Sequence, residues 1–214
     1  MFVIVDVLSF STAVDIAMSR GAMVCPFPHG ENDAAQAVAD KVGAVLAQPR
    51  RTVGGQLSLS PASLMAVRPG MRLMLPPPNG SRLSLACGGK PVLTGCLRNA
   101  AAVARVAREI AGCGTVGVIP AGEHWPDNSL WLAIEDLLGA GAVIHHLVLP
   151  CSPEATAARN AFHAAGQELA SMVRASVSGQ ELINGSFPDD VELAVEQNIG
   201  TWAPLLTEGA CRVA

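Results

Sequence analysis

A single acidic residue lies near the end of the chain's first apolar run. Residues 2–7 are aliphatic or aromatic except for Asp6, and this pattern predicts a buried strand. Burying a carboxylate is costly unless it is paired or bound to a metal. Asp6 is therefore a candidate Mg²⁺ ligand, placed like the acids that hold Mg²⁺ in phosphate-handling α/β folds. The alternative is a structural carboxylate that accepts hydrogen bonds from the N-terminus of a neighbouring helix.

Three hydroxyl side chains follow Asp6 where the next helix is expected to start. They are Ser9, Ser11 and Thr12. Free backbone N–H groups and hydroxyls at a helix start suit an anion such as phosphate. The same residues are also good helix caps, so the sequence leaves both roles open.

The segment Asn79-Gly80-Ser81-Arg82 follows three consecutive prolines. Asn-Gly permits positive φ, so that successive N–H groups can converge on an anion. Ser81 adds a hydroxyl, and Arg82 adds a guanidinium that suits phosphate or sulfonate. The alternative is an Asn-Gly hairpin turn, although the prolines disfavour a regular hairpin.

Two further segments carry polar groups that suit a site. Arg98-Asn99 stands where a predicted strand meets a helix, so Arg98 can bind an anion or stay solvated while Asn99 caps the helix. Glu123 lies in a polar loop, and Glu135-Asp136 lies within a predicted helix. Adjacent helical positions diverge by about 100°, so we expect only one of the pair to face a given site.

Composition excludes several classes of protein. Half of the 214 residues are hydrophobic and 15% are charged, which favours a sizeable core over disorder. The formal charge is −4, without the basic face that nucleic-acid binding requires. The chain has no apolar run of about 18 residues and no basic segment before its first apolar run, so we expect neither a membrane span nor a signal peptide. The six cysteines form no CxxC pair, so we expect free thiols and a cytoplasmic protein.

Apolar runs alternate with Ala-rich stretches of helical periodicity, which predicts an α/β fold. We expect a layered α/β/α domain over residues 1–214, with a mainly parallel or mixed sheet and a helical C-terminal third. The predicted strands are residues 2–7, 23–27, 44–47, 71–75, 92–96 and 115–119. Predicted helices cover residues 11–20, 32–42, 99–111 and 152–176, and a short helical turn follows Ser60-Pro61. A further helix is expected from Asn128 or Ser129 to about Leu138, where Gly139-Ala140-Gly141 would break it. Two more helices are expected near the end of the chain, one capped by Ser178 and one that begins at Pro188.

Four polar loops follow predicted strands, over residues 6–12, 78–82, 95–99 and 121–127. Ligands of open α/β sheets bind beyond the carboxyl ends of the strands. The hypothesis is therefore one site built from all four loops. The nucleophile elbow GxSxG, the P-loop and the zinc motif HExxH are all absent from the sequence.

Taken together, the motifs resemble the 2-phosphosulfolactate phosphatase family, the ComB-like proteins. The matching blocks are Val5-Asp6-Val7-Leu8 with Ser11-Thr12, Ser60-Pro61, residues 78–82, Gly95 with Asn99-Ala100 and Val103-Ala104, Ala121-Gly122-Glu123, Glu135-Asp136 with Ala140-Gly141, and Ser178-Gly179, Leu182 and Asp190-Val191.

The resemblance implies a Mg²⁺-dependent phosphatase that cleaves the phosphomonoester of 2-phospho-3-sulfolactate to sulfolactate, on the route to coenzyme M. Asp6 would hold Mg²⁺ together with Asp136 or Glu123. Arg82 and N–H groups of the Asn79 loop would offset charge on the phosphoryl oxygens. Attack by metal-activated water and covalent attack by Asp6 both remain open. The partner is a small anionic phosphorylated substrate, and the resemblance is compatible with a homodimer.

The chain also departs from the family pattern. Ser9 stands where the family usually has Arg, Phe10 replaces an Ala, and Ser58-Leu59 replaces Gly-Asn before Ser-Pro. An acidic Gly-Glu block has no clear counterpart near Gln48-Pro49-Arg50. Arg98 is the candidate to replace the missing Arg. Two alternatives therefore stay open: a phosphatase for another small anionic ester, and a degenerate relative that binds an anionic metabolite without turnover.

Overall fold

The computed structural model describes residues 1–27, 32–50, 57–75 and 79–214. The predicted loop around Gly54-Gly55 and the three prolines 76–78 lie outside the described residues. The strands are β1 (Phe2–Val5), β2 (Met23–Pro26), β3 (Val45–Leu46), β4 (Arg72–Leu75), β5 (Val92–Gly95), β6 (Gly117–Pro120), β7 (Glu123–His124), β8 (Leu130–Trp131), β9 (Pro204–Thr207) and β10 (Ala210–Val213). The α-helices are α1 (Phe10–Ser19), α2 (Asn32–Val42), α3 (Pro61–Leu64), α4 (Gly80–Leu85), α5 (Ala100–Ala111), α6 (Ile134–Leu147), α7 (Pro153–Ala165), α8 (Leu169–Ala175), α9 (Val177–Asn184) and α10 (Pro188–Ala194).

The α/β class expected from the sequence is confirmed by an eight-stranded sheet in the order β3-β4-β2-β10-β9-β5-β1-β6. Strands β3, β4 and β2 are mutually parallel, and so are β5, β1 and β6. The hairpin β9–β10 joins these two halves through three antiparallel ladders. The two parallel halves therefore run in opposite directions, and the sheet is mixed.

Strand β1 carries the site residue Asp6 directly after its last position. Val3 and Val5 pack into the largest core cluster together with Val103 of α5 and Val143 of α6. The alternate residue Ile4 is also fully buried and points to the opposite face of the sheet, where α4 contacts β1. Because β1 is buried on both faces between β5 and β6, its end is a rigid place for a functional group.

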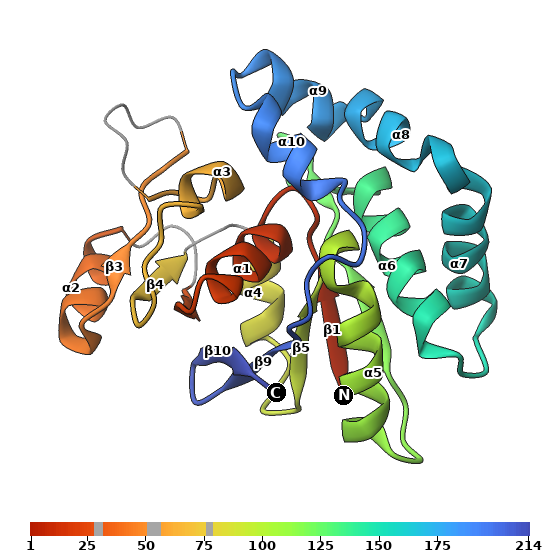
Figure 1. The fold of residues 1–214 in the computed structure, drawn as a ribbon, viewed down its shortest axis with the longest axis horizontal. Helices are drawn as coiled ribbons and strands as arrows, with labels where there is room; N and C mark the ends of the chain where they lie inside the picture. Colours follow the sequence, from red (N-terminus) through yellow and green to blue (C-terminus); the bar gives the residue numbers. More distant parts are fainter. Residues whose placement is uncertain (28–31, 51–56, 76–78) are drawn as a thin grey trace.

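The C-terminal third is helical over α7 to α10, as expected, but it does not stay helical to the end. Helices α8, α9 and α10 follow one another across one side of the molecule (Figure 1). The chain then returns to the sheet as β9 and β10, so the prediction of an all-helical end is wrong. Pro204–Thr207 and Ala210–Val213 pair around a turn with positive φ at Glu208 and Gly209, and the hairpin fills the gap between the two half-sheets.

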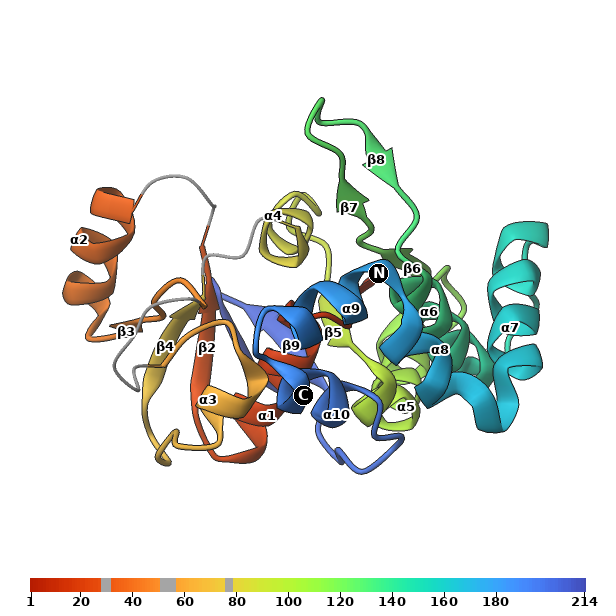
Figure 2. The same cartoon turned by 90° about the horizontal axis from the view of Figure 1, so that it is seen from above.

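The segment after β6 also differs from the prediction. No helix begins at Asn128 or Ser129, because Asn128 has a positive φ of 66° and Leu130–Trp131 pairs with Glu123–His124. The rings of Trp131 and Trp125 pack together with their centroids 4.2 Å apart. The resulting hairpin β7–β8 projects from the body of the molecule (Figure 2) and carries Glu123.

Helix α6 is not broken at Gly139-Ala140-Gly141, contrary to the prediction. A Cβ on Gly139 would lie 2.6 Å from Val7 Cγ2, and one on Gly141 would lie 2.3 Å from the carbonyl oxygen of Ala158. These glycines therefore let α6 pack closely on β1 and α7 while the helix runs on to Leu147. Their role is packing rather than termination.

Two further helix boundaries differ from the prediction. The long helix expected over 152–176 is split into α7 and α8 by a 3₁₀ turn at Gly166–Glu168, because Gly166 takes a positive φ of 47°. The cap of α9 is Ser176, whose hydroxyl accepts a hydrogen bond from the Gly179 N–H at 3.0 Å, rather than Ser178. No helix within the described residues has both the length and the apolar character needed to cross a membrane.

Candidate active site

Asp6 is held by backbone N–H groups from two different elements. Its Oδ1 accepts a hydrogen bond from Phe10 at the start of α1 (3.1 Å), and its Oδ2 accepts one from Gly80 at the start of α4 (2.9 Å). A Cβ on residue 80 would lie 2.8 Å from Asp6 Oδ2 and 2.4 Å from the Phe10 ring. Only glycine permits this close approach of the α4 backbone to the carboxylate.

The three hydroxyl residues after Asp6 have different roles. Ser11 Oγ accepts a hydrogen bond from the backbone N–H of Asp6 (2.9 Å), and Thr12 Oγ1 donates to the carbonyl of Val7 (2.8 Å). Both side chains are fully buried, so they hold the turn between β1 and α1. Ser9 differs from them because its hydroxyl accepts a hydrogen bond from Arg50.

Asp136 closes the turn after β1 from the opposite side. Its Oδ1 accepts a hydrogen bond from the N–H of Val7 (2.7 Å), and its Oδ2 accepts one from Gly122 (2.9 Å). The carboxylate therefore links α6 to the loops that follow β1 and β6. Glu135 is 2% exposed and Asp136 4%, and the charge of Glu135 adds to the effect of burial in raising the pKa of Asp6 and of Asp136. Among the described residues, Asp136 is the one of the pair whose carboxylate accepts hydrogen bonds from these loops.

Asn79 connects the start of α4 to the projecting hairpin. Its Nδ2 donates to Glu123 Oε2 at 2.9 Å. Next along the hairpin, His124 Nε2 lies 3.3 Å from Nη2 of the exposed Arg82. Ser81 takes no part in this contact, because its buried hydroxyl donates to the carbonyl of Phe27 (2.9 Å). Of the expected anion loop, Asn79 and Gly80 therefore contact Glu123 and Asp6, Arg82 contacts His124, and Ser81 fixes α4 to the end of β2.

Asp6, Glu123, Glu135 and Asp136 form what we call the acidic cluster. Burial is the largest cause that raises the pKa of Asp6, Glu123 and Asp136, and repulsion between members of the cluster adds to it. The pKa of Glu123 rises to about 7, although its hydrogen bond with Asn79 opposes the shift. The cluster is thus a buried excess of negative charge that favours a cation.

The chemistry of these groups fits Mg²⁺, which prefers oxygen ligands and usually keeps several water molecules while it binds one or two carboxylates and a substrate phosphate. Within residues 1–27, 32–50, 57–75 and 79–214, no group of three or more His, Cys, Asp or Glu side chains is arranged to hold a metal ion. The acidic cluster therefore suits a cation held by few protein ligands rather than one enclosed by a protein cage.

Arg98 and Asn99 make their hydrogen bonds with residues outside the acidic cluster. Arg98 Nε donates to Asp15 Oδ2 of α1 at 2.8 Å, and Nη1 contacts Glu196 and the carbonyl of Leu193. Asn99 Oδ1 accepts a hydrogen bond from the N–H of Cys96 (2.9 Å) within the turn after β5. The structure therefore joins the loops after β1 and β6 and the start of α4, but it does not join the loop after β5 to them by any hydrogen bond among the described residues.

The sequence analysis missed Arg50, which reaches the turn after β1 from beyond β3. Its Nη2 donates to Ser9 Oγ, and its Nε lies 3.3 Å from Asp190 Oδ2 of α10. Asp190 is held in turn by Ser60, whose hydroxyl donates to Oδ1 at 2.5 Å. Each of these residues is ordinary in its local sequence, so the resemblance at Ser60-Pro61 and Asp190-Val191 was the only signal that pointed to this contact.

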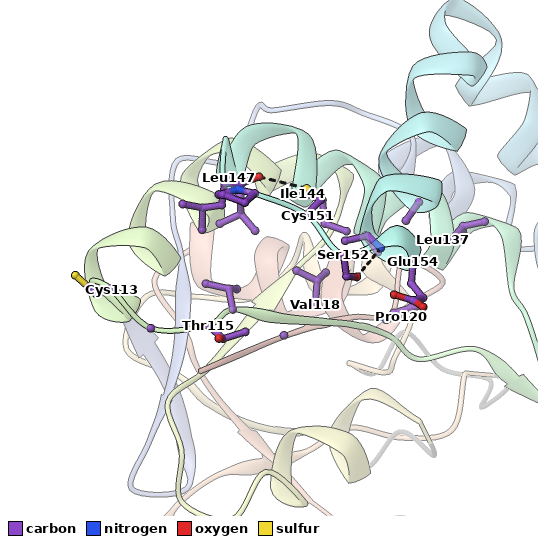
Figure 3. Close-up of a pocket in the computed structure, with 18 of the residues that line it drawn as sticks. Cys113, Thr115, Val118, Pro120, Leu137, Ile144, Leu147, Cys151, Ser152 and Glu154 are labelled. Carbon is purple, nitrogen blue, oxygen red and sulfur yellow. Dashed lines mark hydrogen bonds between the residues drawn. The ribbon is translucent and has the colours of Figure 1, made fainter.

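An apolar cavity of about 690 Å³ lies away from the acidic cluster, between β6, α6 and α7 (Figure 3). Val118, Leu137, Ile144 and Leu147 contribute to its wall. None of the four members of the acidic cluster lines it. Because phosphoryl chemistry requires charged groups, the acidic cluster is the better candidate site.

The chain also matches a known protein family. The family model described as 2-phosphosulpholactate phosphatase matches residues 1–209. The chain belongs to this family. Its members carry the name of a phosphoric monoester hydrolase, and the family resemblance expected from the sequence is confirmed.

Two curated relatives carry the same name over nearly the whole chain. A 2-phosphosulfolactate phosphatase of Methanothermobacter thermautotrophicus is 30% identical over 210 residues, which cover 97% of this chain and 87% of the relative. A probable 2-phosphosulfolactate phosphatase of Symbiobacterium thermophilum is 29% identical over 221 residues, which cover 97% and 91% of the two chains.

Proposed function

We propose that this protein is a Mg²⁺-dependent phosphatase that hydrolyses the phosphomonoester of 2-phospho-3-sulfolactate or of a closely related small anionic ester. The observation that carries the proposal is the Asp6 carboxylate, fixed by the N–H groups of Phe10 and Gly80 inside a buried excess of negative charge. Family membership supports the choice of phosphate monoesters as the substrate class.

The residues of the chain have distinct parts in this proposal. Asp6, together with Asp136 or Glu123, would hold Mg²⁺, and the bound ion would offset charge on the phosphoryl oxygens. Asn79 orients Glu123 through their 2.9 Å hydrogen bond. Arg82, on the exposed side beside His124, stabilises negative charge on the phosphoryl group as the substrate arrives.

The buried turn supplies the rigidity that phosphoryl transfer requires. Ser11, Thr12 and Asp136 hold the backbone on both sides of Asp6. A carboxylate fixed in this way loses little freedom when the substrate binds. The same rigid group suits two pathways, in which Asp6 attacks phosphorus itself or orients a water molecule for attack.

The test is phosphate release from racemic 2-phosphosulfolactate by the purified protein, with Mg²⁺ and after chelation, beside a panel of small phosphomonoesters. We expect turnover that requires Mg²⁺ and is fastest with the sulfonated ester. Preference for another ester would keep the chemistry and replace the substrate. Absence of turnover with every ester, from a protein shown to be folded, would reject the proposal in favour of a relative that binds an anion without catalysis.

A further inference from the structure

Arg50 is held as a fixed cation beside the acidic cluster. Its side chain is 19% exposed, and that of its partner Asp190 is 1% exposed. The guanidinium carbon lies 5.7 Å from the centroid of the Phe187 ring, and Nη2 contacts both Ser9 Oγ and, at 3.4 Å, the carbonyl of Leu59. An arginine restrained in this way on several sides is preorganised to bind an anion.

The contacts of Arg50 do not use up its hydrogen-bonding capacity. Nε lies 3.3 Å from Asp190 Oδ2, but the two atoms are not aligned as a hydrogen bond, and both are buried without such a partner. Among the described residues, none accepts a hydrogen bond from Nη1. Nη1 therefore remains a donor that an oxyanion, carboxylate or sulfonate, can use.

The position of Arg50 indicates which anion it meets. Its Nη2 donates to Ser9, and the next residue, Phe10, donates its N–H to Asp6 Oδ1. Arg50 therefore contacts the same turn that holds the Asp6 carboxylate, and its charge partly offsets the rise in the pKa of Asp6 that burial causes. A small acid whose phosphate lies at Asp6 would bring a second acidic group toward Ser9 and Arg50.

We infer that Arg50 is a specificity-determining residue that binds a second anionic group of the substrate, a sulfonate or carboxylate, while Asp190 and Ser9 position its guanidinium. This inference rests on the proposed phosphatase function and deepens it. It also gives Ser9 a function, because a serine hydroxyl leaves space for the guanidinium of Arg50 and accepts a hydrogen bond from it.

The test compares wild type, Arg50→Met and Arg50→Lys on four esters: 2-phosphosulfolactate, 2-phospholactate, the phosphate ester of isethionate, and isopropyl phosphate. Besides the phosphate, 2-phosphosulfolactate carries a carboxylate and a sulfonate, and 2-phospholactate carries only the carboxylate. The isethionate ester carries only the sulfonate, and isopropyl phosphate carries neither group. In Arg50→Met, kcat/KM for the ester with the recognised acid should fall about 10- to 100-fold relative to that for isopropyl phosphate. Arg50→Lys should recover part of this preference. The single-acid esters show which of the two groups is recognised.

The controls separate specificity from folding. Arg105→Met removes an exposed arginine that pairs with Glu109 on α5 and should leave the preference intact. An equal loss on all four esters in Arg50→Met would assign Arg50 a structural role and overturn the inference. An unchanged preference would overturn it as well.

Failure of the proposed function itself would give a different result. If wild type hydrolyses none of the esters, binding of sulfolactate by calorimetry still tests the inference. We then expect the affinity of Arg50→Met to be about 10- to 100-fold weaker than that of wild type. Equal affinity of the two proteins would overturn the assignment of Arg50.

Discussion

Two buried polar clusters in this protein balance their charges in different ways. In the first, which we call the Arg98 cluster, one guanidinium contacts Asp15, Glu196 and the carbonyl of Leu193. Burial raises the pKa of Asp15 there, and Arg98 opposes this shift. In the second, the acidic cluster around Asp6, repulsion between carboxylates adds to the effect of burial and raises the pKa values of Asp6, Glu123 and Asp136. A cluster that balances its own charge needs no ligand, whereas an unbalanced one is stabilised when a cation binds. We therefore interpret the Arg98 cluster as structural and the acidic cluster as the candidate functional one.

The largest expected effect on stability belongs to the Arg98 cluster. Arg98→Met leaves Asp15, which is fully buried, without its cation, and we expect the free energy of unfolding to fall by about 3–5 kcal/mol. Urea denaturation measures this change. The remaining folded protein should keep its turnover, since the hydrogen bonds of Arg98 within the described residues go to Asp15, Leu193 and Glu196 rather than to the acidic cluster. If the free energy of unfolding fell by less than about 1 kcal/mol, or if turnover were lost without destabilisation, the assignment of the Arg98 cluster as structural would be contradicted.

The second effect concerns the close approach at Gly80. Gly80→Ala places a Cβ 2.4 Å from the Phe10 ring and 2.8 Å from Asp6 Oδ2, so that α4 must move away from the carboxylate. We expect a loss of about 1–3 kcal/mol in unfolding free energy, together with a drop in kcat that the loss of stability does not explain. Normal stability and normal kcat in this variant would show that α4 does not position Asp6.

The smallest effect is the pH dependence of stability in protein stripped of divalent cations. Because the pKa of Glu123 is raised to about 7 from 4.5 in the folded state, its contribution to stability is fully present below about pH 4.5 and is lost as the pH rises through 7. Glu123→Gln stays neutral, so it should exceed wild type by about 1–2 kcal/mol at pH 8 and match it at pH 4, since partial exposure screens the effect. Urea melts at the two pH values measure this difference. A constant difference between the proteins would contradict a titrating Glu123.

The sequence predicted those residues of the candidate site that follow directly from strand patterns. Asp6 stood out because a carboxylate within an apolar run is rare and costly. Asn79-Gly80 stood out because of its turn chemistry, although it begins a helix rather than a hairpin. Asp136 and Glu123 followed from the family resemblance. These residues lie within or next to regular elements, where periodicity and burial leave few alternatives.

The rest of the site depended on contacts between distant residues, which local patterns do not encode. Arg50 lies far from Asp190 in the sequence, and neither residue carries a local signal of their contact. Arg98 is a candidate from the sequence because it follows a predicted strand, yet in the structure it pairs with Asp15 of α1. The prediction of a helix from Asn128 was wrong because contacts with other residues fix this segment. Leu130–Trp131 pairs with β7, and Trp131 packs against Trp125. The prediction of a helical C-terminus was also wrong, because strands β9 and β10 are stabilised by pairing with β5 and β2 on either side.

The most direct test of this account is phosphate release by Asp6→Asn with 2-phosphosulfolactate and Mg²⁺, beside urea melts of the same variant. The substitution removes one charge from the acidic cluster and keeps the size of the side chain. We expect kcat/KM to fall by at least about 10³-fold. The free energy of unfolding should change by less than about 3 kcal/mol, because relief of repulsion within the acidic cluster opposes the loss of one of the two backbone hydrogen bonds to residue 6. Full Mg²⁺-dependent turnover in Asp6→Asn would contradict the assignment of the acidic cluster as the active site.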